Sequence, residues 1–361
     1  MKRLLLLSLM CLPSWGAWSY YYPLTYAAAS CGGATSSGFP ALVSFNAAAM
    51  KDASHGGDVQ SSAGADIEFF SDSVLTIQLP SELDAYDNAN GIGAFWIKGS
   101  CDATAGGTIY MAVGNWSPPS RTTNPWDTGF KGIWHFGSPS TLSIADSTGN
   151  NTTSNQNGVA SGSGKIGGGG AFIAANSTYL DIGNAPAIQV QASTMSAWIN
   201  PNSVTDSVNR AIFGGIGTGD GKPEFRTYRD VGLQLLAQGV SGIGTAGGSL
   251  LTAGVWQHAQ ATYDGTTWIL YLNGVSRASG TQSQSFTHSD DFVIGKGWGT
   301  NESWDGGIDE ARISNVIRSA DWIKAEYNNQ NAPGNIGSPG FWTFGARTAP
   351  AIARGRVVVV Q

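Results

Sequence analysis

The sequence WQHAQATY (Trp256–Tyr263) ends at Asp264-Gly265, and WILYL (Trp268–Leu272) ends at Asn273-Gly274. Asp-Gly and Asn-Gly suit type I′ turns, because both central residues of such a turn need positive φ. Two of these turns in close succession predict a three-stranded antiparallel meander. Such a ribbon must bury one face against another sheet. The residues expected on the buried face are Ala259, Ala261 and Tyr263.

The composition favours short strands over long helices. The 361 residues include 50 glycines, and only 12% of them are charged. Long helices need Ala, Leu, Glu and Lys, whereas a mixture rich in Gly, Ser, Thr and Asn suits strands joined by many turns. Hydrophobic residues make up 41% of the chain, which is enough for packed cores. The composition therefore predicts an all-β protein.

The first residues have the pattern of an export signal. Lys2 and Arg3 precede an apolar stretch, 4–12, that is too short to span a bilayer. The small residues Ser14 and Gly16 fit a cleavage site, so we expect residues 1–17 to be a signal peptide. A lipidated Cys11 is disfavoured by the bulky residues before it. No later stretch is apolar enough to cross a membrane, so we expect the protein to be secreted, periplasmic or at the cell surface.

Two cysteines remain after cleavage, Cys31 and Cys101. An even pair in an exported protein favours one disulfide. It would close a loop of about 70 residues, worth roughly 3–5 kcal/mol in the chain-entropy model. The alternative is two separate buried thiols.

The net charge of −6 becomes more negative when Lys2 and Arg3 are removed. No basic patch rich in aromatic residues is present, which argues against a nucleic-acid partner.

The chain divides by composition into two blocks. Residues 18–116 read as short strands, 117–130 as a stiff Pro-containing linker, and 131–330 as a second β domain. Residues 331–361 form a C-terminal tail whose VVVVQ end is either one added strand or plain tail. The expected N-terminal strands are Trp18–Tyr26, Ala41–Phe45, Asp66–Phe70, Val74–Leu79, Phe95–Lys98 and Thr108–Val113.

One helix is expected in this β-rich chain, over Ser319–Tyr327. Ser319 can cap it, and Trp322, Ile323 and Tyr327 repeat at helical spacing.

From residue 131 onward the chain resembles the concanavalin A-like, laminin-G-type jelly roll. The motifs that carry the resemblance, in family order, are GIWHF (132–136), ADSTGN (145–150), GKIG (164–167), YLDI (179–182), MSAWI (195–199), GVWQH (254–258), LYLNG (270–274), FVIG (292–295) and GGIDEARI (306–313). The resemblance implies a two-sheet β-sandwich as the second domain.

The preceding block resembles an all-β domain of unknown function that often stands directly before such a jelly roll. The carrying stretches are GADIEF (64–69), FWIK (95–98) and TIYMAVGN (108–115). Together the two resemblances imply two β-sandwich domains. Neither implies an established catalytic activity.

Motifs for catalysis are weak. GSGKIG (162–167) matches a dinucleotide fingerprint formally, but it lacks a preceding strand and a following helix, so we expect a glycine turn. Asp309 and Glu310 are adjacent and should face opposite sides of a strand, whereas the acids of a retaining glycosidase share one face. No G-x-S-x-G elbow occurs. The four histidines, at 55, 135, 258 and 288, lack the spacing of a zinc site.

Calcium is the metal that the resemblance implies. Many laminin-G-type domains hold a structural Ca²⁺ between an early loop and the last strands, and the matching positions are Asp146, Asn150 and Asp309. The alternative is that Asp146 caps a turn, while Asp309 or Glu310 pairs with Arg312 or hydrogen-bonds the backbone.

A polar, glycine-rich segment, GKGWGTNESWDGG (295–307), is the candidate ligand-binding loop. Aromatic rings at a sandwich edge can stack on sugars while polar side chains bind hydroxyl groups. The candidate residues are Trp298, Asn301, Glu302, Trp304 and Asp305. The alternative is that one or both tryptophans cover the core.

These observations predict an exported, non-catalytic recognition or adhesion protein that binds a glycan or a surface protein. The alternatives are a structural part of a surface appendage or envelope assembly, and a polysaccharide-active enzyme. Fold analogy carries much of this prediction.

Overall fold

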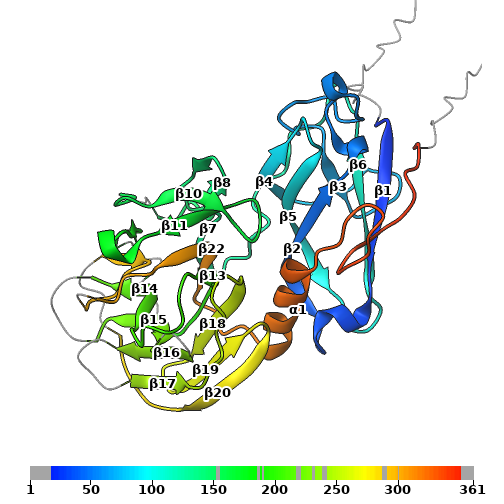
Figure 1. Ribbon diagram of the computed structural model, residues 1–361. Coiled ribbons are helices and arrows are strands. Elements are labelled where there is room, and N and C mark those ends of the chain that lie inside the picture. The colour runs from blue at the N-terminus through cyan, green and yellow to red at the C-terminus, as the bar shows by residue number, and fades with distance from the viewer. Residues whose placement is uncertain are drawn as a thin grey trace, which may run out of the picture.

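The computed structural model describes residues 18–151, 155–184, 188, 191–216, 221–229, 232–237, 242–286, 291–299 and 301–350. The predicted signal peptide and the VVVVQ end lie outside the described residues. Two β-sandwiches lie side by side, with helix α1 (Ala320–Asn331) between them (Figure 1). The predicted fold class, all-β with two sandwiches, is confirmed. No helix in the described ranges combines the length and apolarity needed to cross a membrane.

The N-terminal sandwich packs a four-stranded sheet on a three-stranded sheet. The first has the order β23 (Thr343–Phe344), β1 (Tyr20–Tyr26), β6 (Gly107–Val113) and β3 (Glu68–Phe70), and the second has the order β2 (Ser36–Asn46), β5 (Ile92–Cys101) and β4 (Ser81–Asp87). Short 3-10 turns follow β1 and β2, at Ala28–Cys31, Ala48–Met50 and Ala53–His55. Aromatic residues such as Phe39, Phe69 and Phe95 fill the space between the sheets.

The strand predicted at Val74–Leu79 is wrong. Val74 and Ile77 are exposed, and the Asp72 carboxylate accepts hydrogen bonds from the N–H groups of Thr76 and Ile77. These bonds hold a turn, and the strand that completes the sheet is β4, a few residues later.

The second sandwich has the two large sheets of a jelly roll. The larger sheet runs β10 (Ala160–Ser163), β11 (Gly168–Phe172), β22 (Gly306–Ser314), β13 (Ser193–Pro201), β18 (Gln257–Tyr263), β19 (Thr267–Leu272) and β20 (Val275–Thr281), and β7 (Phe130–Trp134) also pairs with β22. The other runs β12 (Leu180–Asp181), β21 (Phe292–Ile294), β14 (Arg210–Gly215), β15 (Pro223–Tyr228), β16 (Gly232–Ala237) and β17 (Gly242–Ala246). A small hairpin, β8 (Gly137–Ser138) and β9 (Thr141–Leu142), and a 3-10 turn at Ala174–Asn176 lie outside both.

The predicted meander is β18-β19-β20, paired antiparallel throughout. Ala259, Ala261 and Tyr263 belong to the core between the two sheets, as expected. At the second turn Asn273 and Gly274 both have positive φ, as a type I′ turn requires. At the first turn only Gly265 has positive φ, and the Asp264 carboxylate accepts from the N–H groups of Thr266 and Thr267. The type I′ prediction is therefore wrong for the first turn.

The end of the chain returns to the N-terminal sandwich. Ser319 caps α1 by accepting a hydrogen bond from the N–H of Trp322, which confirms the predicted helix start. Trp322 and Trp342 both belong to the hydrophobic core of the N-terminal sandwich. Strand β23 then pairs with β1, so residues after the jelly roll complete the first sandwich.

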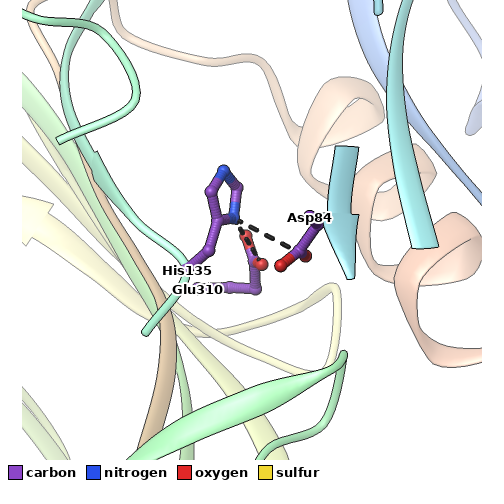
Figure 2. A group of neighbouring side chains, drawn as sticks. All are labelled: Asp84, His135 and Glu310. Atoms are coloured by element: carbon purple, nitrogen blue, oxygen red, sulfur yellow. Dashed lines mark hydrogen bonds and ion pairs between the residues drawn. The ribbon is translucent and has the colours of Figure 1, made fainter. Parts of the chain in front are cut away.

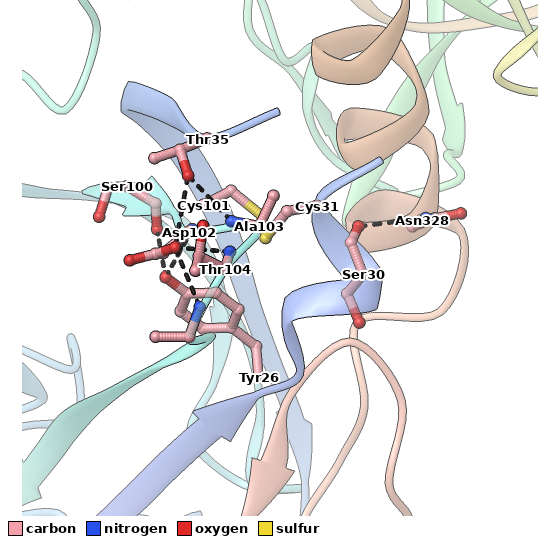
Figure 3. The surroundings of a disulfide bond; sticks show 11 residues. Tyr26, Ser30, Cys31, Thr35, Ser100, Cys101, Asp102, Ala103, Thr104 and Asn328 are labelled. Carbon is pink, nitrogen blue, oxygen red and sulfur yellow. Dashed lines mark hydrogen bonds between the residues drawn. A yellow bond between two sulfur atoms is a disulfide. The ribbon is translucent and has the colours of Figure 1, made fainter. Parts of the chain in front are cut away.

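The predicted disulfide joins Cys31 to Cys101, with the two Cα atoms 5.3 Å apart. Figure 3 shows it between the turn after β1 and the end of β5, close to α1. Next to Cys31, the Ser30 carbonyl accepts a hydrogen bond from Asn328 of the helix at 3.1 Å. The disulfide therefore stabilises the part of the N-terminal sandwich on which α1 packs.

Candidate functional site

The predicted binding segment lies between β21 and β22, and we call its described residues, 295–299 and 301–305, the Trp298 loop. Its base is tied to the six-stranded sheet, because the Trp304 N–H donates to the Gly295 carbonyl and the Ala211 N–H donates to the Glu302 carbonyl. Trp298 is 47% exposed, and Asn301 is also exposed. These two predicted residues are available to a ligand.

Trp304 is not available to a ligand. It has no exposed surface, belongs to the core of the jelly roll, and donates from Nε1 to the Gly307 carbonyl at 3.1 Å. The prediction that Trp304 stacks on a sugar is therefore wrong for this structure. A tryptophan that covers the core was the alternative for this segment.

The two predicted acids hold the loop in place. Asp305 accepts hydrogen bonds from the N–H of Ala174 and from the side chain of Asn202. Glu302 accepts from the N–H of Gly299 and forms an ion pair with Arg226. Both side chains therefore have intramolecular partners, and their predicted contacts with sugar hydroxyls remain a prediction.

A second carboxylate, Glu224 of β15, lies beside Glu302. Arg226 Nη1 binds both acids, with a distance of 3.1 Å to Glu224 Oε1. A Cβ atom placed on Gly297 would lie 2.7 Å from Glu224 Oε2 and 2.8 Å from Glu302 Oε2, so both carboxylates converge under this glycine. Glu224 Oε2 is buried and has no hydrogen-bond partner among the described residues. Sequence reasoning missed this pair, because its members come from distant segments.

Burial raises the pKa of Glu224 to about 7, and the neighbouring Glu302 carboxylate adds to the rise while Arg226 opposes it. A carboxyl group whose pKa is higher in the folded state than in the unfolded state lowers the free energy of unfolding as the pH rises from the unfolded-state pKa to the folded-state pKa. The wild type should therefore lose roughly 2–4 kcal/mol of unfolding free energy through this group as the pH rises from about 4.5 to 8. Glu224→Gln should lack that loss, which urea unfolding at pH 5 and pH 8 measures. An identical pH dependence in both proteins would contradict this expectation.

The residues predicted to bind calcium are engaged within the protein. Asp146 accepts hydrogen bonds from the N–H groups of Ile133, Thr148 and Asn151, as a loop-capping carboxylate does. Asp309 is buried and accepts from the N–H of Ile166. Asn150 lies in the exposed loop after Asp146. Calcium at these three positions remains a prediction.

A different group of side chains could hold a metal ion, at the contact between the two sandwiches. It consists of Asp84 from β4, His135 just after β7, and Glu310 from β22, with one ligand atom of each within 4.8 Å of the others. Figure 2 shows the three side chains pointing toward one another. His135 Nδ1 lies 2.7 Å from Glu310 Oε1 and 3.9 Å from Asp84 Oδ2.

A β-bulge in β22 aims Glu310 at this group. The pairing with β13 shifts register here, and Glu310 has a positive φ of 50°. Ile308 and Ala311 face the jelly-roll core, so both residues between them point away from it. The prediction that Asp309 and Glu310 face opposite sides is therefore wrong, because a bulge adds one residue to the alternation.

Arg312 extends the group toward helix α1. Its guanidinium lies 2.7 Å from Glu310 Oε2 and 2.9 Å from Glu326 Oε1, and it stacks on Trp96 of the N-terminal sandwich at 4.2 Å. Glu326 also accepts a hydrogen bond from Gln260 of β18. One buried arginine thus contacts both sandwiches and the helix between them.

Burial and neighbouring charges shift the pKa values of these three side chains away from their usual values. Burial lowers the pKa of His135, but Glu310 and Asp84 outweigh it and raise that pKa to about 10. Burial raises the pKa of Asp84 to about 8. Burial also opposes ionisation of Glu310, yet His135 and Arg312 hold its pKa below the usual value. The group is therefore a His135–Glu310 ion pair next to a carboxyl group that ionises with difficulty.

A family model described as the concanavalin A-like lectin/glucanases superfamily, of laminin G type, matches residues 174–324. The match covers the jelly roll from the 3-10 turn before β12 through the first part of α1. It does not extend to the N-terminal sandwich. No curated protein sequence matches the chain.

Several solved structures are similar to part of the chain. Domain 4 of AbnA, a GH43 extracellular arabinanase from Geobacillus stearothermophilus in complex with arabinotriose, is 21% identical with a TM-score of 0.44, covering 54% of this chain and 96% of that domain. The binding domain of Paraclostridial Mosquitocidal Protein 1 is 13% identical, with a TM-score of 0.41 and coverage of 55% and 52%. The botulinum neurotoxin serotype D binding domain is 16% identical, with a TM-score of 0.43 and coverage of 55% and 51%. The chain thus spans about half the length of the two toxin domains, and we draw no functional argument from these likenesses.

Proposed function

We propose, from the premise that residues 174–324 form a concanavalin A-like lectin/glucanase domain, that this protein is an exported, non-catalytic recognition protein that binds a glycan. The Trp298 loop is the proposed binding surface. The N-terminal sandwich and α1 act as a platform that presents the jelly roll.

The observation that carries the proposal is the exposure of Trp298 on an anchored loop. Burial is the usual state of a large aromatic ring, and exposed aromatic side chains in fixed positions supply flat surfaces for stacking on sugar rings. Lys296 of this loop forms a cation–π pair with Tyr179 at 4.6 Å, and the exposed Asn301 adds a hydrogen-bonding amide. This combination of one ring and several polar groups is typical of a sugar-binding surface.

Export is supported by the disulfide, because disulfides persist in oxidising compartments outside the cytosol. The N-terminal pattern of a signal peptide agrees with that compartment.

A second candidate function is hydrolysis of a polysaccharide by Glu224 and Glu302. The two carboxylates converge under Gly297, and a pKa of about 7 suits a general acid. Against catalysis, Arg226 binds both acids and Glu224 is almost completely buried. Binding without turnover is therefore the better-supported function.

Replacing Trp298 by Ala should weaken glycan binding by about 2 kcal/mol or more, roughly thirtyfold in Kd, because exposed tryptophans at binding surfaces carry such contributions. The thermal unfolding temperature should stay unchanged, since the ring is about half exposed. Isothermal titration with a glycan that the wild type retains on an array measures the loss.

Trp116→Ala is the matched control. Trp116 is 81% exposed and lies outside the jelly roll, so its removal should leave glycan affinity unchanged. Equal affinities of the Trp298 variant and the wild type would contradict the proposed binding surface.

A further inference from the structure

We propose that Asp84, His135 and Glu310 bind one zinc ion, and that this ion fastens the N-terminal sandwich to the jelly roll. The three ligand atoms lie within 4.8 Å of one another, and ligand atoms around a tetrahedral zinc ion lie roughly 3.3 Å apart, so side-chain adjustments of about an ångström form a first coordination shell. Asp84 belongs to β4 of the first sandwich, and the other two ligands belong to the second. An ion at this point is therefore coordinated from both domains.

One buried carboxylate oxygen of the group is available to coordinate a metal ion. Asp84 has a fully buried side chain, and its Oδ1 atom has no hydrogen-bond partner among the described residues. A buried carboxylate oxygen without a donor costs free energy, which a bound cation recovers.

The charges of the surroundings also favour a cation. Asp84 and Glu310 lie beside His135, and Glu310 and Glu326 lie beside Arg312, so three acidic side chains meet two basic ones. Buried charges are stable when they are paired or when they coordinate a metal. A divalent ion supplies the positive charge that the buried Asp84 carboxylate needs when it is ionised.

The donor atoms select zinc over calcium. One imidazole nitrogen and two carboxylate oxygens suit a four-coordinate zinc ion with a water molecule in the fourth position, whereas calcium takes six to eight oxygens. Coordination needs the deprotonated forms of His135 Nδ1 and Asp84, so the proton that Nδ1 shares with Glu310 and the proton of the Asp84 carboxyl group both leave to solvent.

Neighbouring side chains orient the three ligands. Trp96 Nε1 donates to Asp84 Oδ2, and Arg312 holds Glu310 Oε2, which leaves Glu310 Oε1 directed at His135. His135 Nε2 lies 3.8 Å from Glu82 Oε1, so the outer nitrogen faces a carboxylate. Such outer partners fix the tautomer and the direction of metal-binding histidines.

A groove lies next to the site. It has a volume of about 880 Å³, runs between β4 and the β8–β9 hairpin, and has Asp84 among its lining residues. Asp84 therefore belongs both to the proposed site and to the wall of this groove.

The test uses the complete mature chain after treatment with a chelator. Isothermal titration with zinc chloride should show one ion per chain, and Asp84→Asn should bind it at least about tenfold more weakly. His55→Asn is the matched control, because His55 forms a second histidine–aspartate pair, with Asp52 at 2.7 Å, and is not one of the three proposed ligands. It should bind zinc as the wild type does.

X-ray absorption of the zinc-loaded wild type gives a second readout that needs no variant. The expected first shell has one imidazole nitrogen, with the remaining ligands oxygen. A wild type without zinc binding, undiminished binding by Asp84→Asn, or a shell with two or more imidazoles would each overturn the proposal.

Discussion

Arg312→Met should destabilise the protein by roughly 3–5 kcal/mol, because it leaves buried carboxylates without their cation. Arg312 is buried and binds Glu310 and Glu326 together. Methionine fills a similar volume but cannot neutralise either acid. Urea unfolding, followed by tryptophan fluorescence, measures the change, since Arg312 stacks on Trp96 and Trp126.

Arg347→Met is the control for this prediction. Arg347 also pairs with an acid, Asp58, and stacks on Tyr20 at 3.9 Å, but its side chain is 42% exposed. Exposed ion pairs contribute little, so the loss should stay below about 1 kcal/mol. If both variants lost the same small amount, the buried arginine would not hold the two sandwiches together.

Replacing Cys31 and Cys101 together by Ala should cost roughly 3–5 kcal/mol, the second large effect that we expect. The disulfide closes a chain separation of 70 residues and thereby restricts the unfolded chain. Both sulfur atoms are also buried in the core of the N-terminal sandwich. The thermal unfolding temperature should fall accordingly.

A reductant should produce most of the same shift in the wild type and none in the double variant. Comparing the reduced wild type with the double variant thus separates the effect of losing the covalent link from the effect of losing buried sulfur. A wild type whose unfolding temperature ignores the reductant, with two titratable thiols in the native protein, would show that the cysteines are not joined.

Several features of the fold could be predicted because they depend on local chemistry. Asn273-Gly274 needs positive φ at both residues, and the structure has it there. Ser319 caps a helix whose apolar residues follow helical spacing. Cys31 and Cys101 are the two cysteines outside the predicted signal peptide, and they are joined.

The site was harder to predict, because its geometry depends on contacts between distant segments. The bulge at Glu310 reverses the side on which that residue lies, and alternation along a strand cannot reveal it. Trp304 is buried by residues of the jelly-roll core, although its sequence neighbours are polar and glycine-rich. Asp84 meets His135 only because the two sandwiches pack against each other. For the Glu224–Glu302 pair, the sequence offers one local signal. Glu224 and Arg226 are two residues apart in β15 and therefore lie on one face of that strand.

The most direct test of the proposed function is a glycan array probed with the mature protein, combined with an assay for released reducing ends on every glycan that it retains. Non-catalytic recognition through the jelly roll predicts retention of a defined set of glycans and no release of product. Retention of no glycan, or release of reducing ends that Glu224→Gln abolishes, would contradict it.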